Sequence, residues 1–395
     1  MKYALLLIPT EGLFYYLGFS IQSLPLINIF AIIFLFKNIF KKTKISHNLI
    51  YLYLYLILIT TIYFNIDFIF NDKDRFIFFI RQFVSLTFGL SLFFFIRTLL
   101  LKYSTRVVLN YIFYSYYIVL LFAIISILQG NFFRITSIFT EPSHFGQYLV
   151  FIILPILMIM KNKNYINNQR YLFLFTSVFL LIILTFSFTT VLKFILLFVF
   201  LYLYKNKNWF IFFGRLLFFF ILIIFLYQII KMLYPDNYMF NMTSDILNKI
   251  FSNVSLAEMP LSLLDRLNFW IALFHSKFNL QLFFGYGIAG DYIYGQHLLP
   301  YDIYEKISLV KAVGFNMGSF MGKIFSYGGI VGLISIVYIF YKSIKLQSNS
   351  YIEKAILSSI FIYSTIGIGV FTMIPIWFWL AYVDAKQIKY KWVKS

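Results

Sequence analysis

A short polar segment between two long apolar runs carries the residue types most able to do chemistry. It reads Arg134-Ile-Thr-Ser-Ile-Phe-Thr-Glu141-Pro142-Ser143-His144-Phe145-Gly146, so an arginine, a carboxylate and an imidazole fall within eleven positions. The proline favours an extended Glu141 and allows a helix to begin at Pro142. Glu141 and His144 would then lie around the first turn of that helix. We call residues 134–146 the polar island.

The residue types of the polar island suit proton transfer next to a phosphate group. His144 is expected near a helix N-terminus, where the dipole disfavours protonation and leaves an imidazole that accepts a proton. Glu141 is the alternative base, or it orients a sugar hydroxyl. Arg134 and the more distant Arg266 are permanently charged and bind phosphate oxygens through paired donors. This combination suits glycosyl transfer from a lipid diphosphate sugar, with arginines neutralising the leaving diphosphate. The alternative for the island is a loop that only caps a helix.

The composition is that of a membrane protein. Of the 395 residues, 62% are hydrophobic and only 12% are charged, more apolar surface than a soluble globule of this size needs. The net charge of +19 lies in short basic clusters between apolar runs, which indicates membrane topology rather than nucleic-acid binding. The chain has no cysteine, which excludes disulfides and thiolate sites. Its four histidines show no metal-ligand spacing, so we expect neither a metal nor a cofactor.

Apolar runs of about 20 residues predict an all-α polytopic membrane protein with about twelve spans and both termini in the cytoplasm. The expected spans are 3–20, 22–40, 48–66, 76–100, 108–128, 144–160, two within 171–204 on either side of Ser187-Phe-Thr-Thr190, 210–232, 314–341, and two within 355–385 that turn at Met373-Ile-Pro375. Of the 14 acidic residues, only Glu11, Glu353 and Asp384 are not assigned to the outer side. The chain thus divides into helices over 1–232, one large outer loop over 233–312, and helices with a basic tail over 313–395.

The outer loop is expected to contain two helices. Ile246, Leu247, Ile250, Phe251 and Val254 recur at helical spacing, which predicts a helix lying on the membrane surface. A second helix is expected over 262–277, begun by a capping box of Ser262 and Asp265. Its apolar stripe, which we expect to pack in the interior, comprises Leu263, Leu267, Trp270, Leu273 and Phe274. Arg266 shares a face with Trp270 and either binds substrate or anchors to lipid headgroups.

A glycine motif in the same loop matches a dinucleotide-binding fingerprint by letter. Gly285-Tyr-Gly287-Ile-Ala-Gly290 fits G-x-G-x-x-G, but such a site needs a strand before it and a helix after it. No such βαβ pattern surrounds these residues. We therefore predict a glycine-rich turn.

Three charged residues fall within or near the ends of predicted spans. Arg81 lies inside the span 76–100, where an ionisable group binds substrate or pairs with a carboxylate such as Glu11. Lys193 and Lys323 lie near outer span ends and are expected to extend to the membrane surface.

Three short motifs resemble a known family. The polar island resembles the outer-loop R…F-x-E-P-S segment of bacterial O-antigen and capsule repeat-unit polymerases. The stretch from Asp265-Arg266-Leu-Asn-Phe-Trp270 to Phe283-Phe-Gly285-Tyr-Gly287 is similar to the R…W…G-x-G part of the large periplasmic loop in these polymerases and in O-antigen ligases. The third match is Gly314-Phe-Asn316 followed by Tyr327-Gly-Gly-Ile-Val-Gly332. Order, spacing and topology agree over essentially the whole chain.

The resemblance implies a GT-C-like, metal-independent, inverting glycosyltransferase of the bacterial inner membrane. Its substrates would be undecaprenyl-diphosphate-linked oligosaccharide repeats, and its partners would be membrane lipids, a chain-length regulator and a flippase, without nucleic acid. Arg134 and Arg266 match the arginines thought to bind diphosphate. The catalytic candidates are then Glu141, His144 and Arg266, and the substrate-binding candidates are Arg134, Arg81, Asp265, His297 and Asn316.

Two departures from the family pattern bear on the function. Ligases carry a His-Asn pair where this chain has Phe315-Asn316, which weakens the ligase alternative and leaves the base open. His297 lies far upstream, although folding could bring it close. After Ser187, Lys193 stands where the superfamily often has an arginine. A lipid-linked oligosaccharide flippase is the alternative from another class, and it predicts charged residues along many spans and an internal repeat, which this sequence does not show.

Overall fold

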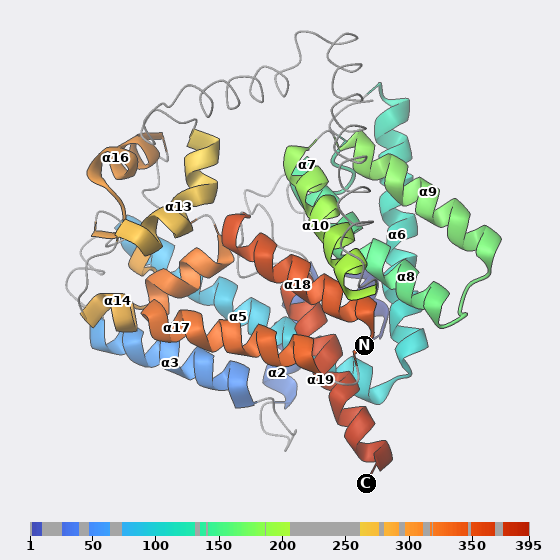
Figure 1. The fold of residues 1–395 in the computed structure, drawn as a ribbon, viewed down its shortest axis with the longest axis horizontal. Coiled ribbons are helices and arrows are strands. Elements are labelled where there is room, and N and C mark those ends of the chain that lie inside the picture. Colours follow the sequence, from blue (N-terminus) through green and yellow to red (C-terminus); the bar gives the residue numbers. More distant parts are fainter. Residues whose placement is uncertain are drawn as a thin grey trace.

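The protein folds entirely into helices in the part of the chain that this computed structural model describes (Figure 1). The described residues are 2–9, 26–38, 47–63, 73–130, 135–139, 141–185, 187–205, 261–275, 280–291, 297–310, 317, 319–346, 349–367 and 374–394. No strand occurs within these ranges. The all-α class predicted from the apolar runs is therefore confirmed.

The first half of the chain forms ten helical elements within the described ranges. They are η1 (Lys2–Leu7), α2 (Leu26–Asn38), α3 (His47–Tyr63), α5 (Lys73–Lys102), α6 (Thr105–Leu128), α7 (Pro142–Tyr148), η3 (Leu149–Ile153), α8 (Leu154–Asn162), α9 (Asn168–Leu184) and α10 (Phe188–Lys205). The expected break at Ser187 is confirmed, because α9 ends at Leu184 and α10 begins at Phe188.

The second half contributes a further set of helices. They are α13 (Leu261–His275), α14 (Leu280–Phe284), α16 (Tyr301–Val310), α17 (Phe320–Lys345), α18 (Tyr351–Ile366) and α19 (Ile374–Lys394). The expected division of 355–385 into two helices is also confirmed, since α18 is capped at Gly367 and α19 starts at Ile374; Pro375 lies inside α19, and residues 368–373 lie outside the described part. The expected surface helix at 246–254 and the expected span 210–232 lie outside the described residues.

Four described segments are long and apolar enough to cross a membrane. They are Phe76–Lys102, Thr105–Leu128, Pro142–Asn162 and Phe320–Lys345. The apolar helices Asn48–Ile62 and Asn168–Leu184 are shorter. Large apolar side chains such as Leu121 on α6 and Phe173 on α9 are exposed, as lipid-facing residues would be. These features fit a protein embedded in a membrane.

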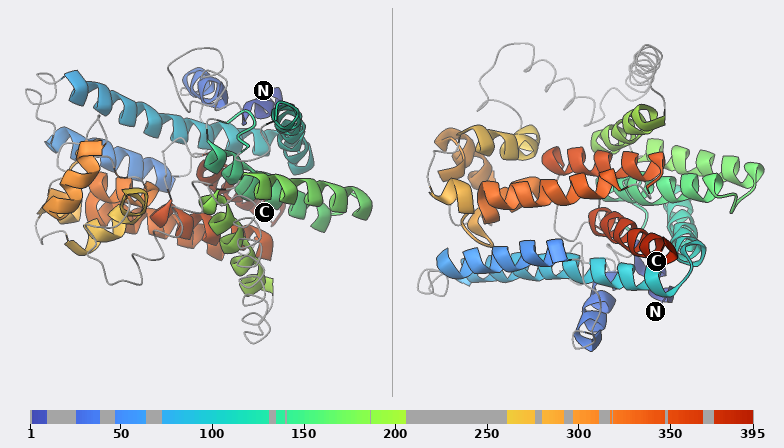
Figure 2. Two further views of the ribbon diagram at one scale, coloured as in Figure 1. Left: turned by 90° about the horizontal axis from the view of Figure 1, so that it is seen from above. Right: turned by 60° about the horizontal axis from the view of Figure 1, so that its bottom comes forward.

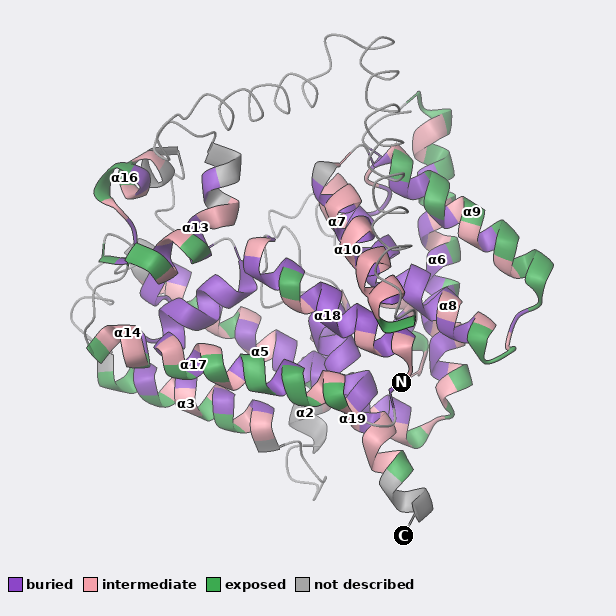
Figure 3. Cartoon of the chain, in the orientation of Figure 1, coloured by how far each residue is buried: buried purple, intermediate pink, exposed green. Residues whose placement is uncertain are grey.

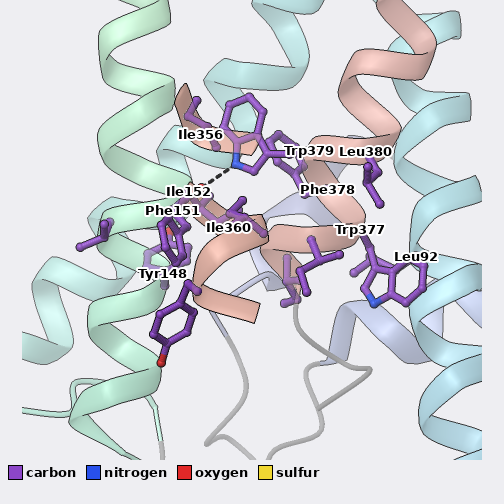
Figure 4. Packing of buried hydrophobic residues seen from close by; sticks show 14 of the residues in the cluster. Leu92, Tyr148, Phe151, Ile152, Ile356, Ile360, Trp377, Phe378, Trp379 and Leu380 are labelled. Atoms are coloured by element: carbon purple, nitrogen blue, oxygen red, sulfur yellow. Dashed lines mark hydrogen bonds between the residues drawn. The ribbon is translucent and has the colours of Figure 1, made fainter. Parts of the chain in front are cut away.

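Buried residues concentrate along η3 and the start of α8, along α18 and α19, and in the first part of α17 (Figure 3). Helix α19 packs against α5, and α18 packs against both α10 and α17, so helices from the two ends of the chain lie side by side (Figure 2). At the centre of this core, the indole N–H of Trp379 donates to the carbonyl of Phe151, 2.6 Å away in the π-helical turn η3 (Figure 4). This bond satisfies the one polar group of a fully buried tryptophan.

Helix α17 is broken at Gly329, and the glycine motif fills the break. Gly329 has φ +59° and ψ −156°, which interrupts the helix and deprives the preceding carbonyls of their usual partners. The N–H of Tyr286 donates to the Ser326 carbonyl at 2.9 Å, and that of Gly287 donates to the Tyr327 carbonyl at 3.0 Å. A Cβ on Gly285 would lie 2.4 Å from the Tyr327 carbonyl carbon, so only glycine fits. The prediction of a glycine-rich turn is confirmed.

Two acidic residues that the charge pattern left off the outer side pair with basic residues. Asp384 of α19 contacts the Arg97 Nε at 2.6 Å, and Glu353 of α18 contacts the Lys386 Nζ at 2.5 Å. Glu353 also completes a capping box with Ser350 at the start of α18. Each of these two carboxylates is therefore compensated by the positive charge of a neighbouring side chain.

Candidate functional site

The polar island forms the start of α7 as its sequence predicts. Glu141 is the N-cap with an extended backbone, at φ −136° and ψ 147°, and Pro142 is the first helical residue. The Glu141 side chain makes no capping bond with the helix. Its carboxylate instead accepts the Ser143 hydroxyl at 3.1 Å and lies 4.0 Å from His144 Nε2. Glu141 and His144 thus lie at ion-pair distance from each other at the helix start.

Lys193 reaches this helix start from α10, and it does so from inside the protein. Only 1% of Lys193 is exposed, and its Nζ donates to the Ser143 carbonyl at 2.7 Å. The same ammonium lies over the ring of Tyr363, 4.8 Å from the ring centroid. The expectation that Lys193 extends to the membrane surface is therefore wrong, because backbone and aromatic partners hold its ammonium within the helix bundle.

A close helix contact brings Lys193 to the polar island. A Cβ added to Gly146 of α7 would lie 1.9 Å from the Thr190 hydroxyl oxygen of α10, so the two helices touch where glycine has no side chain. Lys193 follows Thr190 by one helical turn and therefore lies on the same face of α10. This geometry directs the lysine toward the first turn of α7.

Tyr363 lies on α18, the helix that packs against both the helix of Lys193 and α13, which carries Arg266. Helix α18 packs against α10 on one side and α13 on the other, and its C-terminal end lies between them (Figure 1). Tyr363 is near that end, and its ring contacts the Lys193 ammonium. Sequence reasoning missed Tyr363, which carries no signal among 32 tyrosines.

Helix α13 presents a different face to the protein from the one predicted. Its buried residues are Leu264, Asn268, Phe269 and Ala272. Trp270 and Phe274, expected to pack inside, are 37% and 82% exposed. The reason is that Phe269 packs against Phe325 of α17, with ring centroids 6.2 Å apart, and this contact orients the helix. Arg266 stays half-buried at the boundary between the two faces.

The other candidate residues lie elsewhere or outside the described part. Arg134 and Asn316 lie outside the described residues, as does the side chain of Asp265. Arg81 is exposed on α5, a helix that packs mainly against α2 and α19. His297 is exposed just before α16, which packs against α13. Among the described candidates, the structure therefore brings together Glu141 and His144, and it places Lys193 beside them.

A second polar cluster surrounds the first part of α17. Lys323 is 3% exposed and its Nζ donates to Gln82 Oε1 of α5 at 2.8 Å. Nearby, the buried Asp291 accepts the Met317 N–H at 2.8 Å. The prediction that Lys323 extends to the membrane surface is also wrong, since Gln82 gives it a partner inside.

The described residues contain no group of three or more acidic or histidine side chains placed to hold a metal ion. No family model, curated protein or solved structure matches the chain. The chemistry of the site itself therefore carries the functional argument. It offers a carboxylate and an imidazole at a helix start, with a buried ammonium behind them.

Proposed function

We propose that this protein is a bacterial inner-membrane glycosyltransferase that joins lipid-diphosphate-linked oligosaccharide repeat units into a polysaccharide. The observation that carries the proposal is the set of contacts at the start of α7. Lys193 bonds the Ser143 carbonyl beside Glu141 and His144 and lies over the ring of Tyr363 on α18, a helix that also packs against α13, which carries Arg266. A proton acceptor and a cation, which transfer from a lipid diphosphate requires, thus lie together at this helix start. The motifs that resemble repeat-unit polymerases point to the same reaction.

The proposed reaction assigns a task to each group. The hydroxyl oxygen of the acceptor sugar attacks the anomeric carbon of the donor, and the bond from that carbon to the diphosphate oxygen breaks. Attack opposite to the leaving group inverts the anomeric centre. Glu141 or His144 takes the hydroxyl proton, while Lys193 and Arg266 stabilise the charge that remains on the lipid diphosphate. Because Lys193 is buried, its charge acts in a medium of low dielectric constant, where its effect is stronger than in water.

We place the site at the outer face of the membrane because basic residues gather at the opposite helix ends. Lys161 lies in the last turn of α8, Lys205 in that of α10 and Lys345 in that of α17. By the positive-inside rule these ends face the cytoplasm, and Glu141 then faces outward. The same rule, applied along the whole chain, supports about twelve spans with both termini inside.

Purified protein in proteoliposomes provides the test. With a lipid-linked repeat unit as the only substrate, it should produce a ladder of longer lipid-linked glycans. Arg266→Ala and Arg134→Ala should abolish the ladder, whereas Arg170→Ala, which removes an arginine on α9 bonded to Tyr117, should not. Transfer to a lipid A core without a ladder would identify a ligase. Full activity in both site variants would remove the diphosphate-binding role.

A flippase is the second candidate, and the buried cluster around Lys323 favours it. A lysine inside a span-like helix, bonded to Gln82 of another helix, resembles the polar interior of a transporter. The break of α17 at Gly329 adds a second such feature. A flippase would carry a labelled lipid-linked unit across the proteoliposome bilayer without lengthening it, so the same preparation distinguishes the two activities.

A further inference from the structure

The exposed face of α17 changes in chemical character toward the end of the helix. Ile334 is aliphatic and 62% exposed. Tyr338 and Tyr341 follow on the same face and are 53% and 52% exposed. Lys342 and Lys345 lie in the last turn of the helix, and both are exposed. One face of a single helix thus passes from aliphatic to aromatic to basic side chains.

The two lysines lie against the two tyrosine rings. Lys342 Nζ is 5.8 Å from the ring centroid of Tyr338, and Lys345 Nζ is 4.5 Å from that of Tyr341. Lys345 Nζ also donates a hydrogen bond to the Tyr341 hydroxyl. Residues 320–352 contain no aspartate or glutamate, so α17 offers these ammonium groups no carboxylate of its own. The helix dipole places only about half a negative charge at this end, and two lysines therefore leave it cationic.

The length of this face matches one leaflet of a bilayer. A helix rises about 1.5 Å per residue, so Val331 and Tyr341 are roughly 15 Å apart along the axis, about half of a hydrocarbon core of ~30 Å. Helix α17 is itself long and apolar enough to cross a membrane. Helix α3 packs against it, and both helices carry exposed positions on the side of the molecule that Figure 3 shows. Acyl chains can cover the aliphatic part, while tyrosines are suited to the level of the headgroups.

We propose that the C-terminal end of α17 binds an anionic phospholipid, with Lys342 and Lys345 at its phosphate and Tyr338 and Tyr341 just below. Basic residues near a membrane surface attract anionic lipids, and a lysine stem that lies along apolar surface carries its charge to the headgroups. A zwitterionic headgroup offers these two ammonium groups no net negative charge. A lipid fits this face better than an acidic protein segment does, because the basic positions continue directly into aliphatic ones. The inference does not depend on the proposed transfer reaction.

A fluorescent label on the aliphatic part of this face tests which lipid lies there. The chain has no cysteine, so Ile334→Cys gives one labelling position in the full chain. The label is the fluorophore NBD, and the protein is placed in phosphatidylcholine nanodiscs. The quenchers are phosphatidylglycerol and phosphatidylcholine, each with a nitroxide on its acyl chain and added at the same small mole fraction. The phosphatidylglycerol should quench on the order of fivefold more strongly, and high salt should reduce this preference.

Paired substitutions show whether the two lysines cause the preference. Lys342→Gln with Lys345→Gln should bring the ratio of the two quenching strengths to about one, whereas arginine at both positions should preserve the preference. Lys102→Gln with Arg106→Gln is the matched control, because it removes two exposed positive charges at the adjoining ends of α5 and α6. This control should leave the ratio at its original value.

A second labelling position shows whether the preference is local. Leu121 of α6 has a similar exposure of 57%, so a label on Leu121→Cys should be quenched equally by both lipids.

Four outcomes would overturn the proposal. Equal quenching of the Ile334→Cys label by both lipids would remove the anionic lipid. An unchanged ratio in Lys342→Gln with Lys345→Gln, or an equal loss in the α5 and α6 control, would remove the specific role of these lysines. Protection of the label from both lipids would identify a second copy of the chain as the occupant of this face.

Discussion

Lys193 donates to the carbonyl of Ser143 across 2.7 Å, although fifty positions separate the two residues. The bond connects the start of α7 with the face of α10 that carries Thr190. A lysine with 1% exposure is costly in free energy unless polar groups surround it. The carbonyl of Ser143 and the ring of Tyr363 supply such partners and offset part of that cost.

Lys193→Met should therefore separate stability from activity. Methionine has a similar length and no charge, so the thermal midpoint should stay within a few degrees of the wild type or rise, because a buried charge is removed. Glycan transfer should fall at least a hundredfold as one of the two cations is lost. Thermal unfolding in detergent and ladder formation measure the two properties. A variant that is both stable and fully active would contradict the role of Lys193.

Gly146→Ala should disturb the site from a distance. The new methyl group would lie 1.9 Å from the Thr190 hydroxyl oxygen, which forces α7 away from α10 at a cost of about 1–3 kcal/mol. The Ser143 carbonyl would then move away from Lys193 and transfer would fall. Adding Thr190→Gly removes the clash and should restore part of the activity. If the double variant is no better than Gly146→Ala, the close contact does not position Lys193.

Substitutions of Glu141 and His144 should have non-additive effects on the rate of glycan transfer. Their side chains are 4.0 Å apart, so removing either one changes the surroundings of the other. The residue that acts as base should cost about 10²–10⁴ in rate when replaced by glutamine, and its partner should cost less. Glu141→Gln with His144→Gln should be hardly slower than the more damaging single variant. Rates from single-turnover ladder assays decide this, and multiplicative losses would argue for independent roles.

Gly287→Ala should destabilise the fold, because Gly287 has a structural role and does not bind a dinucleotide. Gly287 has φ +80°, and a Cβ there would lie 2.7 Å from the Thr60 Cα of α3. Backbone strain and the clash together should cost roughly 2 kcal/mol or more. Thermal unfolding should show the loss, while NAD should leave the melting curve of the wild type unchanged. A shift produced by NAD would restore the dinucleotide interpretation of the glycine motif.

Replacing Arg97 alone should lower the free energy of unfolding more than replacing Arg97 and Asp384 together. Arg97 is almost fully buried, and Asp384 Oδ2 lies 2.6 Å from its Nε. Arg97→Leu should cost about 3 kcal/mol, because it leaves a carboxylate without its partner. Arg97→Leu combined with Asp384→Leu should recover much of that loss. Chemical unfolding of the single and double variants provides the measurement, with equal stability of both contradicting the pairing.

The sequence was most informative where local rules apply. The Glu141-Pro142 dipeptide predicted an extended N-cap followed by a helix, and the structure has both. The break at Ser187, the division of 355–385 into two helices and the glycine turn at 285–290 follow from the same local preferences. The all-α class followed from the apolar runs alone. Long apolar segments that lack the alternating polar and apolar pattern of strands satisfy their backbone hydrogen bonds most readily as helices.

Other features depend on contacts between distant residues, and the sequence predicted these poorly. The prediction of which face of α13 is buried was wrong, because an apolar stripe does not show which side of the helix packs against α17. The contact between Phe269 and Phe325 determines that side. Lys193 and Lys323 were expected at the membrane surface, since snorkelling is the default for a lysine near a span end. Their partners Ser143 and Gln82 come from other helices, and only folding places them within reach.

The polar island shows the same division. Its residue types and their spacing determined that Glu141 and His144 share the first helical turn, because i to i+3 spacing on a helix requires it. Tertiary structure decided what lies behind them, since Gly146 admits α10, α10 brings Lys193, and α18 brings Tyr363 between α10 and α13. Local backbone preferences are a property of the sequence, but the meeting of side chains from different helices depends on how those helices pack.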